Sequence, residues 1–91
     1  MARTMNREPT HPGEMLLEEF LKPMKLTQAA AADKLGISLN RLNEIVKGKR
    51  GVTADTALRL AKLTGTSPEF WLNLQNAVDL YHARQAMAAT R

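Results

Sequence analysis

The residues with the clearest capacity for chemistry lie between Leu26 and Arg50. A segment there reads as the outer face of a short helix. Its side chains can hydrogen-bond to base edges or phosphate oxygens, and they are Asn40, Arg41, Asn43, Glu44 and Lys47. Two further cations, Lys49 and Arg50, follow directly after Gly48. Amides and cations at this spacing indicate nucleic-acid recognition rather than bond-breaking chemistry.

Catalytic and metal-binding patterns are not recognisable in the sequence. The two histidines, His11 and His82, fall near opposite ends of the chain without a ligand cluster beside them, and there are no cysteines. We find no Ser-His-Asp set, phosphate-binding glycine loop or catalytic pair of carboxylates. We therefore expect no enzymatic activity, no metal and no cofactor.

Two short helices joined by a glycine turn are expected to position the polar face. Thr27 is a natural N-cap for the first, Gln28 follows at its positive end, and Gly36 can take the left-handed conformation that ends it. Ser38 caps the second helix, expected over about residues 38–47. The inner sides are apolar, with Leu35, Ile37, Leu42 and Ile45. This layout is typical of a DNA-binding helix-turn-helix, with Gln28 and Ser38 among the contact residues. A plain helical hairpin has the same outline.

The positive charge of the chain is concentrated around this motif. The net charge is +4, and residues 25–62 carry eight basic against three acidic side chains. The flanking segments together are slightly acidic, so all the excess positive charge lies where a polyanion would bind. The alternative is a solvated basic face without a ligand.

The periodicity of the chain predicts an all-α protein, a compact bundle of five helices. Besides the helix-turn-helix pair, helices are expected over residues 13–22, ended by Pro23, over 54–63, and from 68 to at least 84. We expect a flexible N-terminal arm (1–11), one domain (12–84) and a C-terminal tail or frayed helix end (85–91). No signal peptide or membrane-spanning run is recognisable, so a cytoplasmic protein is expected.

The fifth helix has more apolar surface than a peripheral helix needs. A heptad-like seam runs along it through Trp71, Leu74, Val78 and Tyr81, and a second apolar face adjoins it. We predict that the seam is a homodimer interface, because two-fold dimers let helix-turn-helix proteins read paired half-sites. The alternative is that a small domain uses both faces for its own core.

Four segments resemble a known family. LTQAAAADKLGIS and LNRLNEIVKGKR resemble the lambda-repressor-like, Xre-type helix-turn-helix. HPGEMLLEEFLKPMKLTQ and VTADTALRLAKLTGTSPEFWLNLQ, with the following VDLYHAR, resemble the HigA/VapI antitoxins. The resemblance covers about residues 11–84. It implies a dimeric repressor of its own operon that binds operator DNA and neutralises a RelE/HigB-like toxin, an mRNA-cleaving enzyme.

The resemblance also implies residue roles. Gln28 lies where family members contact a phosphate, Asn40, Arg41 and Asn43 on the exposed face of the recognition helix, and Lys47, Lys49 and Arg50 on the phosphate side. Leu39 departs from the glutamine that many lambda-like repressors carry, and a leucine can touch a thymine methyl but cannot hold adenine. Any toxin would bind the N-terminal arm, the acidic first helix or the outside of the bundle.

Three interpretations remain open from the sequence. The first is a DNA-binding antitoxin and autoregulator. The second is a stand-alone repressor without a toxin. The third is a protein-interaction module whose helix-turn-helix no longer binds DNA. DNA binding separates the third from the others, and a toxin encoded by the neighbouring gene separates the first from the second.

Overall fold

The computed structural model describes residues 8–90, and this part of the chain is all-helical. Its elements are α1 (Pro12–Leu16), η2 (Leu17–Leu21), α2 (Lys22–Met24), α3 (Gln28–Leu35), α4 (Leu39–Val46), α5 (Ala54–Thr64) and α6 (Pro68–Ala89). The first three are consecutive and form one helix, so the described residues contain the five helices that the sequence predicts. Most of the predicted N-terminal arm, residues 1–7, lies outside the described residues.

The prediction that Pro23 ends the first helix is wrong. The helix continues through Pro23 to Met24 because its middle, η2, is a π-helical turn. The Lys22 amide donates to the carbonyl of Leu17, five residues back, and the wider turn makes room for the proline ring. Met24 is the last residue of the helix, and Lys25, which follows it, has a left-handed φ of 57°.

Side-chain caps set the starts of the next helices, as the sequence predicts. The hydroxyls of Thr27, Ser38, Thr53 and Ser67 accept hydrogen bonds from backbone amides in the first turns of α3, α4, α5 and α6. Gly36 ends α3 with a φ of 75°, and its amide donates to the Ala32 carbonyl. The turn between α3 and α4 therefore has the predicted glycine geometry.

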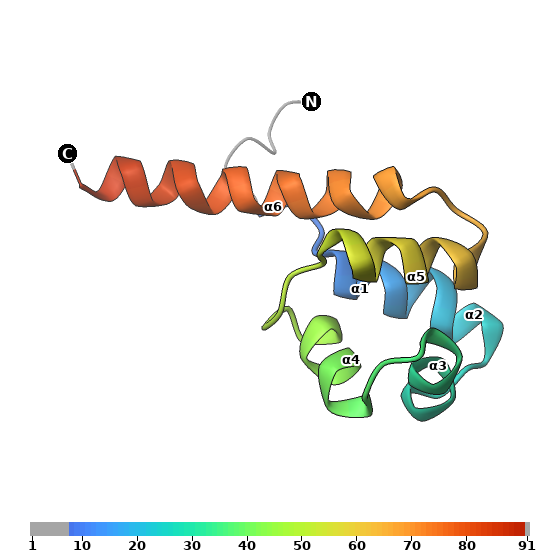
Figure 1. Ribbon diagram of the computed structural model, residues 1–91. Coiled ribbons are helices and arrows are strands. Elements are labelled where there is room, and N and C mark those ends of the chain that lie inside the picture. The colour runs from blue at the N-terminus through green and yellow to red at the C-terminus, as the bar shows by residue number, and fades with distance from the viewer. Residues whose placement is uncertain (1–7, 91) are drawn as a thin grey trace.

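Figure 1 shows how the helices are layered. α6 lies along α5, and the pair α3 and α4 lies on the other side of α5 from α6 (Figure 1). α4 packs against α3 and against α1. The C-terminal part of α6 projects beyond the rest of the bundle, and α6 continues unbroken to Ala89, through most of the predicted tail (Figure 1).

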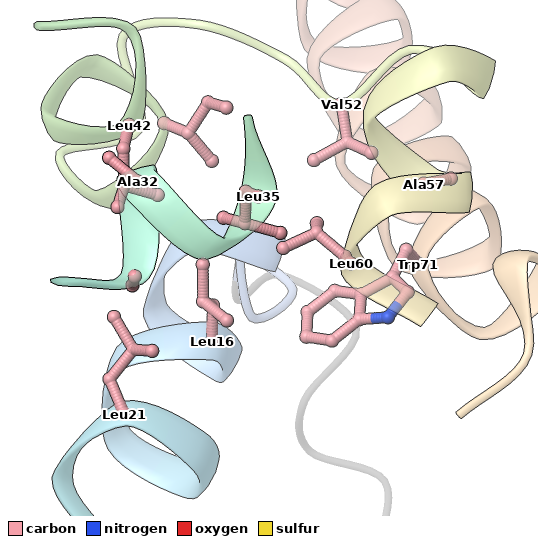
Figure 2. Packing of buried hydrophobic residues seen from close by; sticks show 11 residues of the cluster. Leu16, Leu21, Ala32, Leu35, Leu42, Val52, Ala57, Leu60 and Trp71 are labelled. Atoms are coloured by element: carbon pink, nitrogen blue, oxygen red, sulfur yellow. The ribbon is translucent and has the colours of Figure 1, made fainter. Parts of the chain in front are cut away.

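The hydrophobic core lies where all five helices meet. Figure 2 shows Leu35, Leu60 and Trp71 pointing toward one another from α3, α5 and α6. Trp71 is fully buried, and its indole Nε1 donates to the Thr66 hydroxyl at 2.8 Å. The ring of Phe20 lies 5.5 Å from that of Trp71, which joins the first helix to α6.

The core settles which face of α6 is inward. Trp71 is 0% exposed and Val78 is 2% exposed, so both are covered within the single chain. The prediction that these two residues form a dimer interface is therefore wrong, and the alternative of a self-made core holds for them. Leu74 and Tyr81 are half-buried. Among the helices of residues 8–90, none is long and apolar enough to cross a membrane.

Candidate nucleic-acid interface

Helix α4 is held firmly on its inner side and open on its outer side. Leu42 and Ile45 are fully buried, whereas Asn40 is exposed and Leu39 is 50% exposed. The Ser38 Oγ accepts a hydrogen bond from the Arg41 amide at 3.0 Å, which fixes the start of the helix. Because α4 is anchored by its apolar stripe, its outer face is presented as a rigid unit.

A shallow hollow of the helix-turn-helix is lined by residues of α3 and α4, which are Gln28, Ala29, Leu39, Asn40 and Asn43. The Asn43 Nδ2 donates to the Gln28 Oε1 at 3.2 Å, so the two amides meet across the hollow. Each amide keeps further donor or acceptor capacity, and Leu39 adds an exposed methyl surface. These groups suit the base edges and thymine methyls of a major groove.

Arg41 is directed away from this hollow. Its Nη2 donates to the Thr56 Oγ1 at 2.6 Å and contacts the Asp55 Oδ2 at 3.3 Å. Its side chain is only 31% exposed. Arg41, expected on the exposed face of the recognition helix, is therefore docked on the start of α5 in this structure.

Asp55 also pairs with Arg59, which connects α5 to α3. The Arg59 Nε donates to the same Asp55 oxygen at 3.0 Å, and the Arg59 Nη1 donates to the Leu35 carbonyl at 2.9 Å. The hydrogen bond from Arg59 lowers the pKa of the Asp55 carboxyl, helped by Arg41 and opposed by partial desolvation. Asp55 is thus an anion at neutral pH and a shared acceptor for two guanidinium groups.

The cations after α4 are differently disposed. Lys47 and Lys49 are exposed. The Arg50 Nη2 lies 2.8 Å from the Glu44 Oε1, so this guanidinium is already paired with a carboxylate. The two lysines are therefore the cations of this loop that most readily meet a phosphate.

Comparison with known proteins identifies the family. A profile described as helix-turn-helix matches residues 17–71. Antitoxin HigA-1 of Vibrio cholerae is 46% identical over 83 residues, which cover 90% of this chain and 77% of that protein. This chain belongs to the HigA-type antitoxins of the helix-turn-helix family.

Two further relatives extend the comparison. Virulence-associated protein I of Dichelobacter nodosus is 55% identical over 75 residues, covering 82% of this chain and 69% of that protein. A solved structure, Pseudomonas aeruginosa antitoxin HigA with the higBA promoter, is similar with a TM-score of 0.85 and 41% identity. The matched region covers 90% of this chain and 89% of the chain in that structure. The fold of this HigA-type chain is therefore one already seen on DNA.

The first helix supports the recognition helix through a glycine. A methyl group placed at Gly13 would overlap the carbonyl oxygen of Ile45, so the backbones of α1 and α4 are in direct contact there. From its position in the sequence, Gly13 is expected only to begin a helix. A glycine directly after the proline at the helix start was the available signal.

His11 caps the same helix. Its Nδ1 accepts a hydrogen bond from the Gly13 amide at 3.0 Å, and burial lowers the pKa of its ring below 6.5. The ring also lies beside Gly48, in the loop that carries Lys47 and Lys49. The His82 Nε2 lies 2.8 Å from the Glu8 Oε2. Within residues 8–90, no group of acids and histidines could hold a metal ion.

The predicted site residues thus divide into three groups. Gln28, Asn40 and Asn43 come together in the hollow, with Ser38 capping the helix behind them. Lys47, Lys49 and Arg50 lie in the following loop. Arg41 belongs instead to a network with Asp55, Thr56 and Arg59, three residues that the sequence analysis did not select.

Proposed function

We propose that the protein is a DNA-binding antitoxin that binds its operator as a homodimer, represses its own operon and neutralises a RelE/HigB-like toxin. Membership of the HigA-type antitoxins supports the antitoxin role. The single observation that carries the DNA-binding role is the hollow of amides and exposed leucine on the outer face of α4. A relative of the same fold has been solved with the promoter of its operon.

The hollow is the proposed base-reading surface. Asn40 and Asn43 are proposed to hydrogen-bond to base edges, and Leu39 to contact a thymine methyl, because all three line the hollow. Gln28, at the start of α3, is placed for a phosphate, because backbone amides at that helix end add positive potential. Lys47 and Lys49 supply sequence-independent attraction to the DNA backbone.

The dimer is proposed to form through the projecting part of α6. Leu80 is 52% exposed and Met87 is 72% exposed, while Ala77 is exposed on the same side at helical spacing. These residues replace Trp71 and Val78 in the proposed interface. Leu74 and Tyr81, which are half-buried, remain proposed as neighbours of the contact.

The acidic outer surface of the first helix supports the toxin partner. Glu14, Glu18 and Glu19 are exposed, and negative charge suits an enzyme built to bind RNA. None of the three lines the hollow, but Glu14 shares a pocket with Lys47 and Lys49. The toxin is therefore proposed to bind around Glu18 and Glu19, and DNA to bind at the hollow.

The test combines DNA binding with co-expression. We expect a gel-shift with the DNA upstream of its own gene that persists against an excess of random duplex. We also expect rescue of growth when the adjacent toxin gene is expressed. Specific DNA binding without a toxic partner would favour the stand-alone repressor. Rescue without DNA binding would leave only the antitoxin role.

A further inference from the structure

One carboxylate, that of Asp55 in α5, contacts two guanidinium groups that lead to α4 and to α3. The Asp55 Oδ2 lies 3.3 Å from Arg41 of α4 and accepts from Arg59 of α5 at 3.0 Å. Arg59 in turn donates to the Leu35 carbonyl at the end of α3. The Asp55–Arg41–Arg59 network therefore runs from the end of α3 through α5 to the first turn of α4.

The network holds the side of α4 that its apolar residues leave unsupported. Leu42 and Ile45 anchor the helix toward the core, and Gly13 sets how closely α1 approaches it. The Arg41 guanidinium adds a polar contact between α4 and α5, because its Nη2 donates to the Oγ1 of Thr56, a residue only 2% exposed, at 2.6 Å.

We propose that Asp55 is a positioning residue for operator specificity, acting through Arg41 to orient the recognition helix rather than touching DNA. The inference rests on the proposed function, since it concerns how the operator is read. The proposed effect of Asp55 on operator binding is opposite to the effect expected from its negative charge alone. An acid beside a polyanion should oppose binding, and its removal should help. If Asp55 orients α4, its removal should impair operator recognition while leaving general DNA attraction intact.

The Asp55→Asn variant distinguishes a positioning role of Arg41 from the alternative, in which Arg41 reads bases. Both roles predict that Arg41→Ala weakens operator binding. If Arg41 read bases, Asp55→Asn would release the guanidinium toward DNA, and operator binding would stay equal or strengthen. If Arg41 positions α4, Asp55→Asn weakens operator binding although it removes a negative charge.

The experiment measures dissociation constants of the full chain for the operator and for a random duplex of equal length, at several salt concentrations. We expect Asp55→Asn to weaken operator binding about tenfold, the lower end of the loss for one misplaced base contact. Binding to the random duplex should be unchanged or tighter, and the salt slope unchanged, since no phosphate contact is lost. Asp55→Glu should recover part of the operator affinity.

Three further variants complete the test. Thr56→Val keeps the side-chain shape without the hydroxyl and changes no charge, so it should also lower the ratio of operator to random binding. Asp33→Asn, the control, removes another exposed negative charge, on α3, and should not lower that ratio. Arg41→Ala with Asp55→Asn should lose no more than Arg41→Ala alone.

The outcomes are distinguishable. A wild-type chain that does not prefer its operator would overturn the proposed function itself. A wild-type preference that survives Asp55→Asn and Thr56→Val would overturn the positioning role alone. Thermal unfolding of each variant is measured alongside. A variant that is fully folded at the assay temperature yet loses the preference supports the proposal, and loss of preference only in unfolded samples contradicts it.

Discussion

At the residue scale, the side chains near the recognition surface differ in whether a carboxylate of the protein already holds them. Asn40 and Leu39 are exposed, whereas Arg41 and Arg50 are held by Asp55 and Glu44. Formal charge therefore overstates the cations available to DNA. Lys47 and Lys49 are exposed, and unlike Arg50 they have no ion pair with another residue of the described range 8–90.

The lysines of this loop should act on all DNA alike. Lys49→Ala is expected to weaken binding to operator and random duplex by similar factors, and to lower the salt slope by about 1. Arg50→Ala should change the slope less, because its guanidinium is paired with Glu44. A Lys49→Ala variant that lost affinity for the operator only would show base reading instead.

The His11 cap should make stability depend on pH. The ring must be neutral at Nδ1 to accept from the Gly13 amide, and burial holds its pKa below 6.5. The stabilisation by the His11 cap is therefore complete above about pH 6.5. It is lost as the pH falls through the lower pKa that His11 has in the folded protein. The carboxylates of Glu8, Asp79 and Glu14 oppose this shift, and His82 adds to it.

Thermal unfolding of wild type and His11→Ser would measure this dependence. Serine is a good N-cap that does not titrate in this range. We expect the melting temperature of the wild type to fall between about pH 7.5 and about pH 5.5, and the fall to be smaller in the variant. Equal falls in both proteins would assign the pH dependence to other groups.

At the element scale, caps and glycines made the helices of the helix-turn-helix predictable. Thr27, Gly36 and Ser38 act locally, within a few residues, and their geometry is as expected. Pro23 was misread because proline statistics describe α-helical geometry, whereas the chain is π-helical just before it.

The orientation of Arg41 could not be predicted from its spacing. A long side chain on a helix surface can turn to either side, and the choice here depends on Asp55 and Thr56, which are 14 and 15 residues away. The inward face of α6 was equally undetermined, because two adjacent apolar faces fit the same periodicity. Trp71 and Val78 face inward because α5 and the first helix cover them.

The contact between α1 and α4 should be intolerant of added volume. Gly13→Ala is expected to destabilise the fold by about 3 kcal/mol, since the methyl group meets the backbone of Ile45 and the two helices must separate. Gly65→Ala is the control. It has a φ of 75° but open space around it, so only backbone strain of about 1 kcal/mol is expected. Denaturant unfolding that gave equal losses would contradict the close approach.

At the scale of the whole molecule, the projecting end of α6 should govern assembly. Leu80→Asp with Met87→Asp places charges on exposed positions, so the fold should survive while the dimer separates. We expect sedimentation to show a monomer and operator affinity to fall, because one recognition helix alone binds weakly. In the wild-type dimer the recognition helices should lie roughly 34 Å apart.

Asn76→Asp is the matched control, as it adds a charge to an exposed polar position of the same helix. It should remain dimeric. If the Leu80 and Met87 variant also sedimented as a dimer, the interface would have to lie elsewhere on the chain.

On α4, the residues that hold the helix in the core differ from the residues proposed to contact DNA, and this difference affects how such proteins can diverge. Leu42 and Ile45 are fully buried, while Leu39 and Asn40 contribute little to the core. Substitutions at the exposed pair can accumulate without cost to folding, since surface changes usually alter stability by about 0.5 kcal/mol or less. Duplicated copies in one genome can therefore acquire separate operators by drift at a few outward positions, and so avoid silencing each other's operons.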